Sequence, residues 1–409
     1  MKTVTTLVFA HLCFSVFSQT NQLSIDQAID LALKNNLSIV AATTDIERHR
    51  QLKKASFELP KTEVSLLYGQ YNSYAEQDNN ITITQAIPFT ALGSQRSLNQ
   101  ALISSYELRK ASAENELVYQ VKKVYYQLAF SVARNELLLQ EDSIFAGFLK
   151  AASLRYQAGE TNLLEKATAE TQQNQVKNEL EKNKSDIAIL RTQLKTLVNA
   201  STPPEVADTE LLQIDFSDTA DTLGISLNPA LAVVRQEVEI AKGLKKVEVA
   251  KFAPDMRVGF FSQTLIDVED PENGRPATGG DRFTGFQVGL ALPLWFAPHQ
   301  AKIRAAELAK RSAQNIYDDQ NQALHSVVEQ AFGSYQKNKK SLSYYQTSAL
   351  PNADLILKQS QISYKEGDIA YHEYLLGVRN AMTIKEEYLR TLNEYNQSII
   401  YIQFLSGNK

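Results

Sequence analysis

One pattern occurs twice along the chain, and this repetition constrains the fold more than any other feature of the sequence. The segment "LRYQAGETNLLEK" (154–166) returns as "ISYKEGDIAYHEY" (362–374), with Tyr156 and Gly159 matched by Tyr364 and Gly367 at an offset of 208 residues. A long repeat of this kind indicates two copies of one structural unit. We predict these copies at residues 19–200 and 225–409, joined by a polar linker at 201–224.

Each copy is predicted to run helix, strand, strand, very long helix, helix. The 409-residue chain has only 11 prolines, and none lies between Phe89 and Thr202. Apolar residues in this interval recur at spacings of four and three, as on a helix that packs one stripe against a neighbour. They are Leu117, Val121, Val124 and Leu128. The helices expected at 92–156 and 301–364 would each be about 100 Å long, and they would need coiled-coil-like contact with other helices.

Gly159 stands where the first long helix should end. Glycine costs a helix roughly 1 kcal/mol relative to alanine, so its position between two helical segments requires an explanation. A residue without Cβ adopts positive φ readily, as tight turns after a helix often require. We therefore predict that Gly159 and Gly367 mark the reversals between the long helices and the helices that follow them.

Four segments of alternating polarity are predicted strands, at 62–74, 80–90, 255–266 and 282–294. In "NNITITQAI" (79–87), Ile81 and Ile83 alternate with polar threonines. In "GFQVGLALPLW" (285–295), every second residue from Phe286 to Leu294 is apolar. Strands with one apolar face and one polar or small face are typical of a membrane β-barrel with a wet interior.

Four strands cannot close a barrel alone, because known membrane barrels begin at about eight strands. An open sheet edge is not tolerated in lipid, so strands in a membrane would have to be shared between several copies of the chain. The alternative is that the strand pairs cap a soluble helical bundle. Phe89, Trp295 and Phe296 stand at the strand ends, where we expect aromatic side chains to act as membrane-interface anchors.

Residues 1–18 have the pattern of a secretory signal peptide, with Lys2, an apolar run, and small residues before the expected cleavage site. The single cysteine of the chain, Cys13, lies in this segment. No later window holds eighteen consecutive apolar residues, so no transmembrane helix is predicted. The formal net charge of −4 and the lack of a long basic run argue against nucleic acid as a partner.

The sequence lacks the motifs of common enzyme classes. "HEYLL" at 372–376 has no second histidine four residues after the first, unlike a zincin helix, and no P-loop, G-x-S-x-G or dinucleotide fingerprint occurs. Soft metal sites normally need several thiolates or thioethers, and Met256 and Met382 are the only methionines after Met1. We therefore expect no catalytic residues, no cofactor and no metal site.

Three features together resemble the TolC-like outer-membrane efflux proteins. They are the opening "LSIDQAIDLALKNN" (23–36), the strand pairs that end in "QAIPF" and "LALPLW", and the paired Tyr-x-x-Gly tips. The resemblance implies a mainly α fold with a small antiparallel β part, in a homotrimer that forms an α-barrel in the periplasm and a shared twelve-stranded transmembrane β-barrel. Within the family, the sequence looks most like the heavy-metal efflux components of the CusC or CzcC kind.

The resemblance also implies a function. The chain would be the duct of a tripartite efflux system in the outer membrane. It would passively conduct substrates from an inner-membrane pump of the resistance-nodulation-division type, joined through a periplasmic adaptor protein. Heavy-metal cations are the expected cargo. The alternatives are a duct for drugs and other small organic compounds, or a periplasmic coiled-coil scaffold without channel activity.

The candidate site residues surround the two glycines. In the family, acids six residues after the second glycine line the periplasmic mouth, so the resemblance implies an acidic ring of Glu373 that favours cations. Glu165 is the equivalent acid in the first copy. From the residues alone, the favoured interpretation is that both acids stay solvated and complement a helix N-terminal dipole. The candidates for gating or adaptor docking are Tyr156, Gly159, Glu160, Tyr364, Gly367 and Asp368.

Overall fold

The computed structural model describes residues 22–70, 73–207, 210–216, 227–269, 271 and 274–407. The predicted signal peptide at 1–18 lies outside the described residues, as does the linker segment 217–226. The described residues group into two compact units. We call them the hairpin unit (residues up to Asn36, Leu117–Asp218 and Ala331–Ile402) and the sheet unit (Leu37–Glu116, Thr219–Gln330 and the residues from Gln403 onward).

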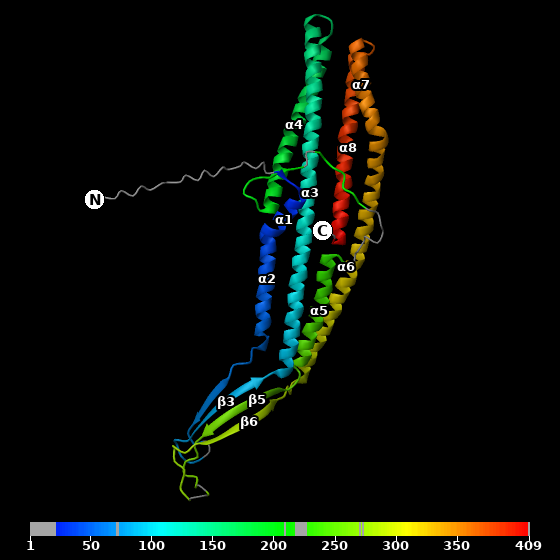
Figure 1. Cartoon of the computed structure of the whole chain (residues 1–409). Coiled ribbons are helices and arrows are strands. Elements are labelled where there is room, and N and C mark those ends of the chain that lie inside the picture. The colour runs from blue at the N-terminus through cyan, green and yellow to red at the C-terminus, as the bar shows by residue number, and fades with distance from the viewer. Residues whose placement is uncertain are drawn as a thin grey trace, which may run out of the picture. The chain divides into compact units, whose positions relative to one another are not determined.

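The order of elements follows the predicted repeat (Figure 1). The first half contains α1 (Ile25–Asn35), α2 (Leu37–Lys54), the 3-10 turn η1 (Ala55–Phe57), β2 (Glu63–Tyr68), β3 (Asn79–Ile87), α3 (Phe89–Gln157) and α4 (Leu163–Val198). The second half contains α5 (Pro229–Ala250), β5 (Asp255–Gln263), β6 (Phe283–Ala291), α6 (Phe296–Tyr344), η4 (Tyr345–Ala349), α7 (Leu350–Glu366) and α8 (Tyr371–Ser406). Two further short strands, β1 (Gln22–Leu23) and β4 (Glu205–Val206), pair in parallel.

The boundaries differ from the predicted ones in three places. A single opening helix was expected, but Asn36 adopts an extended conformation that separates α1 from α2. The strands are shorter than expected, so that Phe89 begins α3 and Leu292 and Leu294 follow the end of β6. The second long helix is not uniformly α-helical, because residues Tyr345–Ala349 form a π-helical turn.

Pro351 explains the π-helical turn. Proline lacks an N–H group and its ring clashes with the carbonyl four residues earlier in a regular α-helix. Just before it, the N–H of Leu350 bonds to the carbonyl of Tyr345, five residues back. The wider turn therefore lets the chain pass Pro351 without ending the helix, as π-bulges commonly do.

Two helical hairpins make up most of the hairpin unit. Hairpin 1 is the part of α3 from Leu117 onward together with α4, joined around Gly159, and hairpin 2 is α7 and α8, joined around Gly367. The predicted stripe on α3 is confirmed, since its four residues are at most 9% exposed. A shared apolar core joins the two hairpins, and it contains Phe145, Phe148, Val176, Leu180, Val378 and Met382. Burial of each such large side chain stabilises the fold by about 1.5–3 kcal/mol.

Part of the polar linker is fixed to the hairpin unit. The fully buried side chain of Asn396 in α8 accepts a hydrogen bond from the Ile214 N–H (2.9 Å) and donates to the Leu212 carbonyl (2.8 Å). The ring of Phe216 packs edge-on against that of Tyr335, with centroids 5.2 Å apart. The described residues of this linker therefore form a strap over α8.

The sheet unit contains a four-stranded antiparallel sheet in the order β2-β3-β5-β6. The two halves of the chain meet at its centre, where Ile83 of β3 pairs with Phe260 of β5. Among the described residues, the outer edges of β2 and β6 have no partner strand. The sheet is therefore open at both sides within one chain.

The predicted alternation of the strands is confirmed by the register. One row of directly paired residues crosses all four strands and consists of Val64, Ile83, Phe260 and Phe286. The neighbouring row, with side chains on the opposite face, consists of Glu63, Thr84, Gly259 and Gln287. The apolar face is uncovered in the single chain, since Phe286 and Val288 are 86% and 76% exposed. Large apolar faces of this kind mark a surface that meets lipid or another protein.

Within the described part of the chain, every helix is too short or too polar to cross a membrane.

Candidate functional site

Both glycines of the repeated motif lie at tight reversals. Gly159 has φ of 76° and Gly367 has φ of 83°. At each turn the next residue closes a bond to the carbonyl five positions back, from Glu160 to Arg155 and from Asp368 to Ser363 (both 2.9 Å). These bonds satisfy carbonyls that the helix end leaves open. The conformational role predicted for the two glycines is therefore confirmed.

The tip of hairpin 1 holds Glu165 in a closed set of polar contacts. Its carboxylate lies 2.9 Å from the Arg155 guanidinium, and it also accepts a hydrogen bond from the Thr161 hydroxyl. Its backbone N–H donates to the side chain of Asn162, which caps α4. The Glu165 side chain is only 14% exposed. Glu165 is thus committed to contacts within its own hairpin.

The tip of hairpin 2 leaves Glu373 in a different position. One carboxylate oxygen of Glu373 accepts the N–H of Ala370 at 3.0 Å, closing the first turn of α8. The residue itself is exposed, as are Asp368 and His372 beside it. The two equivalent acids of the repeat therefore differ, because Glu165 is enclosed by Arg155 while Glu373 caps a helix at the surface.

The tyrosines of the two tips differ in the same way. Tyr156 is exposed and lies under the Lys166 ammonium, 5.6 Å from its ring centroid. Tyr364 is half-buried and stacks on Tyr374 of α8, with centroids 4.7 Å apart. The repeated Tyr-x-x-Gly motif thus supplies one surface ring and one packing ring.

A groove of about 770 Å³ opens between the two tips. Its lining includes Arg155, Glu165, Tyr364, Tyr371 and His372. The Tyr371 ring is held edge-on against Phe148 of α3, with centroids 5.9 Å apart. Its buried hydroxyl has no hydrogen-bond partner among the described residues. Burial, followed by the nearby Glu165 carboxylate and Tyr364, raises the pKa of Tyr371 to about 12.

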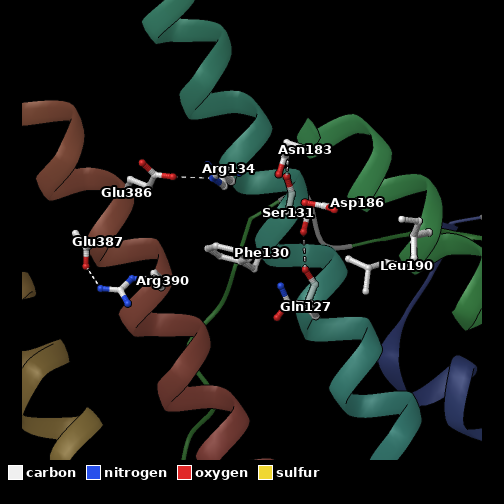
Figure 2. Close-up of a pocket in the computed structure, with 11 residues that line it drawn as sticks. Gln127, Phe130, Ser131, Arg134, Asn183, Asp186, Leu190, Glu386, Glu387 and Arg390 are labelled. Atoms are coloured by element: carbon white, nitrogen blue, oxygen red, sulfur yellow. Dashed lines mark hydrogen bonds and ion pairs between the residues drawn. The ribbon is translucent and has the colours of Figure 1, made fainter. Parts of the chain in front are cut away.

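A second polar cluster ties the hairpins together away from their tips (Figure 2). Arg134 of α3 donates from Nε to Glu386 of α8 at 2.7 Å, and from a terminal nitrogen to Glu179 of α4 at 3.2 Å. Burial opposes the charge of Arg134, but its hydrogen bonds to these two carboxylates raise its pKa overall. Beside it, the buried amide of Asn183 donates to the Ser131 carbonyl at 2.8 Å. One side chain therefore links three helices.

The Arg134 cluster borders an open cavity of about 610 Å³. Arg390 and Glu387 of α8 form a further ion pair on its wall, and Gln127 and Leu190 face it from α3 and α4 (Figure 2). Burial, and next the Glu386 carboxylate, raise the pKa of nearby Glu141. The ion pairs of Arg134 and Arg390 hold these side chains in place on the cavity wall. The cluster therefore supports the packing of the helices.

Sequence reasoning did not identify Arg134, Tyr371 or Tyr374. The contacts of Arg134 join residues 45 and 252 positions away, which no local pattern indicates. The two tyrosines do carry a local signal, since they lie three residues apart in the first turn of α8. Such spacing on one helix face indicates a packed stripe.

The described residues contain no group of three or more His, Cys, Asp or Glu side chains that would hold a metal ion. Asp368 and Glu373 at the tip of hairpin 2 are exposed, so their negative charge can attract hydrated cations from the solvent.

Solved structures of several outer-membrane channels have a similar architecture. CusC, whose structures concern folding and transmembrane channel formation, is 16% identical and aligns over 94% of this chain and 92% of its own, with a TM-score of 0.76. The outer-membrane channel OprN is 15% identical over 94% of this chain and 90% of its own, also at 0.76. The CmeC outer membrane channel of Campylobacter jejuni is 14% identical over 94% and 86%, at 0.74.

The chain has the fold of these channels. The predicted fold class, mainly helical with a small antiparallel sheet, is confirmed by this likeness. By sequence, the chain matches no protein-family model and no curated protein.

Proposed function

We propose that the chain is the outer-membrane duct of a tripartite efflux system and works as a homotrimer. The observation that carries this proposal is the open sheet, whose apolar row runs from Val64 on one edge strand to Phe286 on the other. In a trimer, β6 of one copy pairs with β2 of the next, and three copies close a twelve-stranded barrel. Closure removes the edges that lipid does not tolerate.

The faces of the sheet fit such a barrel. Val64, Ile83, Phe260 and Phe286 face the lipid, and the row with Thr84 and Gln287 faces the wet interior. Trp295, which is 83% exposed, and the exposed rings of Phe89 and Phe296 lie just after strands β6 and β3. They act as the interface anchors of the barrel, as aromatic rings do at membrane surfaces.

The two tips form the periplasmic end of the duct. Glu373 lines the mouth, since it is exposed and uses one carboxylate oxygen for its cap. Three copies give an acidic ring that favours cations. Glu165 takes no part in this ring, because Arg155 neutralises it. The exposed tip residues Tyr156, Glu160 and Asp368 meet the periplasmic adaptor, which joins the duct to an inner-membrane pump of the resistance-nodulation-division type.

Heavy-metal cations are the proposed cargo, and the acidic mouth supports this choice over small organic compounds. The metal passes through in its hydrated form, and the pump selects it. The duct itself catalyses no reaction.

Membrane fractionation tests this function. The duct is expected in the outer membrane as a trimer whose mobility in gel electrophoresis changes on heating. Deletion of residues 62–90, which removes β2 and β3, should abolish the trimer. A protein recovered only as a soluble monomer in the periplasm would instead support the scaffold and reject the duct.

A further inference from the structure

Two grooves rich in basic residues flank α3 in the sheet unit. The first, of about 590 Å³, lies where α2 meets α3. Arg50, Lys53 and Lys54 of α2 line it together with Arg96 of α3. The Arg96 guanidinium lies 5.2 Å from the centroid of the exposed Phe57 ring, so an apolar surface adjoins the cations.

The second groove has the same character in the other half of the chain. It measures about 600 Å³, and Lys242, Lys245 and Lys246 of α5 line it with Lys310 of α6. Val249, which is exposed, also lines it. The second groove therefore also places cationic side chains beside apolar ones.

The same three-residue sequence, Leu-Lys-Lys, supplies lysines to both grooves. "LKK" occurs at 52–54 near the end of α2 and at 244–246 near the end of α5. Each of these helices precedes the first strand of a strand pair, β2 or β5. Both copies of the repeat thus carry a basic groove within a few residues of the apolar sheet.

The carboxylates near the grooves neutralise only part of the positive charge of the lysines and arginines. Glu107 pairs with Arg50 at 3.1 Å, and Glu307 bridges Lys245 and Lys310 at 2.8 and 3.3 Å. Within the described ranges, Lys54, Arg96 and Lys246 have no carboxylate within 4.0 Å, and all three are exposed.

Both grooves open on the same side of α3. Asn99 of α3 bonds to Leu52 and Ser56 of α2, while Leu98 of α3 packs on α5. Because Leu98 and Asn99 are consecutive, the two contacts lie about 100° apart around the α3 axis at 3.6 residues per turn. The two contacts divide the surface of α3 into a narrower and a wider side. The α3 residues that line the grooves, such as Arg96, lie on the wider side. In a layer that curls into a barrel, the wider side is the outer surface.

From this placement, the geometry points to a pair of binding sites for the phosphate headgroups of anionic phospholipids, in the membrane leaflet that meets the helical end of the barrel. This inference rests on the proposed function, because it requires the sheet to lie in a membrane. Lysine and arginine bind the phosphate, and Phe57 and Val249 contact the first acyl carbons. Long basic side chains at such a boundary reach from an apolar surface to charged groups.

Native mass spectrometry of the full-length trimer tests the inference, with phosphatidylglycerol and phosphatidylcholine as probes. The wild type is expected to bind phosphatidylglycerol more tightly. A variant with Lys53→Gln, Lys54→Gln, Lys245→Gln and Lys246→Gln should lose this preference by at least about tenfold, given about fivefold for each basic residue near an anionic surface. The corresponding lysine-to-arginine variant should keep it.

A matched control removes the same charge elsewhere. Lys177, Lys337, Lys340 and Lys358 are all exposed in the hairpin unit, and their change to glutamine should leave lipid binding unaltered. Equal loss in this control would overturn the inference, because it would show a net-charge effect. So would competition by inorganic phosphate alone, which would identify a site for soluble anions.

The channel readout separates this inference from the proposed function. If the glutamine variant keeps both its conductance and its phosphatidylglycerol preference, the lipid sites are rejected while the duct stands. If the wild type forms no trimer and no conductance, the duct itself is rejected, and the lipid sites with it.

Discussion

Arg134 of α3 donates a 2.7 Å hydrogen bond to Glu386 of α8, across 252 positions of the sequence. The same guanidinium bonds Glu179 of α4, so that hairpin 1 is tied internally and also joined to hairpin 2. The Arg134 side chain is 19% exposed, whereas its two partners are about 40% exposed. Removal of the cation alone leaves both carboxylates near a partly buried surface, which is the costly way to break such a pair.

The variant Arg134→Met should therefore lower the thermal midpoint of the trimer. Two charge-assisted hydrogen bonds disappear, and after discounting for solvent screening we expect a loss of about 1–2 kcal/mol per protomer. Circular dichroism in detergent measures it. Arg311→Met is the control, since Arg311 is exposed and has no ion pair in the described part of the chain. Equal midpoints for the two variants would show that the Arg134 cluster does not hold the hairpins together.

Tyr371→Phe should be neutral or stabilising near pH 7, because the buried hydroxyl has no hydrogen-bond partner among the described residues. The pH dependence gives a sharper test. In the folded protein the pKa of Tyr371 is raised to about 12 from its ordinary value of 10. The unfolded chain thus releases this proton first, and the wild type loses stability as pH rises from 10 to 12.

The phenylalanine variant lacks that proton, so the stability difference between Tyr371→Phe and the wild type should widen across this pH range. Tyr74→Phe serves as the control, since Tyr74 is 97% exposed. Parallel curves of stability against pH for the wild type and Tyr371→Phe would contradict the burial of the Tyr371 hydroxyl.

Substitution of the turn glycines should weaken the tips. Alanine at Gly159 or Gly367 must adopt a left-handed conformation that costs an L-residue roughly 1–2 kcal/mol, although no atom lies within 4 Å of the added Cβ. Gly147→Ala is the matched control, because Gly147 lies inside α3 with equal space around it. That change should stabilise the protein by up to about 1 kcal/mol. Thermal midpoints that fall by the same amount at all three positions would refute this account.

Adjacent residues of β6 should respond oppositely to a charge. Val288→Arg places a cation on the apolar face and should reduce the amount of assembled trimer in the outer membrane, at a cost of about 2–4 kcal/mol if the residue lies near the bilayer centre. Gln287→Arg places the same cation on the polar face and should be tolerated. The heat-modifiable band in membrane fractions reports the difference. Similar loss in both variants would mean that the two faces are not separated by lipid and water.

The sequence contained enough information to predict the repeat, the element order and the two faces of the sheet. These features depend on local periodicity, because residues on one face recur about every 3.6 positions in a helix and every 2 positions in a strand. The π-helical turn before Pro351 and the break at Asn36 were missed, because both are small local departures within strongly helical segments. The Arg134 cluster and the different surroundings of Glu165 and Glu373 were not predictable, since they depend on contacts between distant segments.

Ion conductance in planar bilayers tests the central claim most directly. Purified trimers of the wild type should produce stepwise, cation-selective conductance, and Glu373→Ala should keep the conductance but reduce the preference for cations. Glu165→Ala should change that preference much less, because Arg155 already neutralises Glu165. Heat-modifiable trimers that insert into the bilayer but conduct no ions would contradict the proposal that this chain forms a duct.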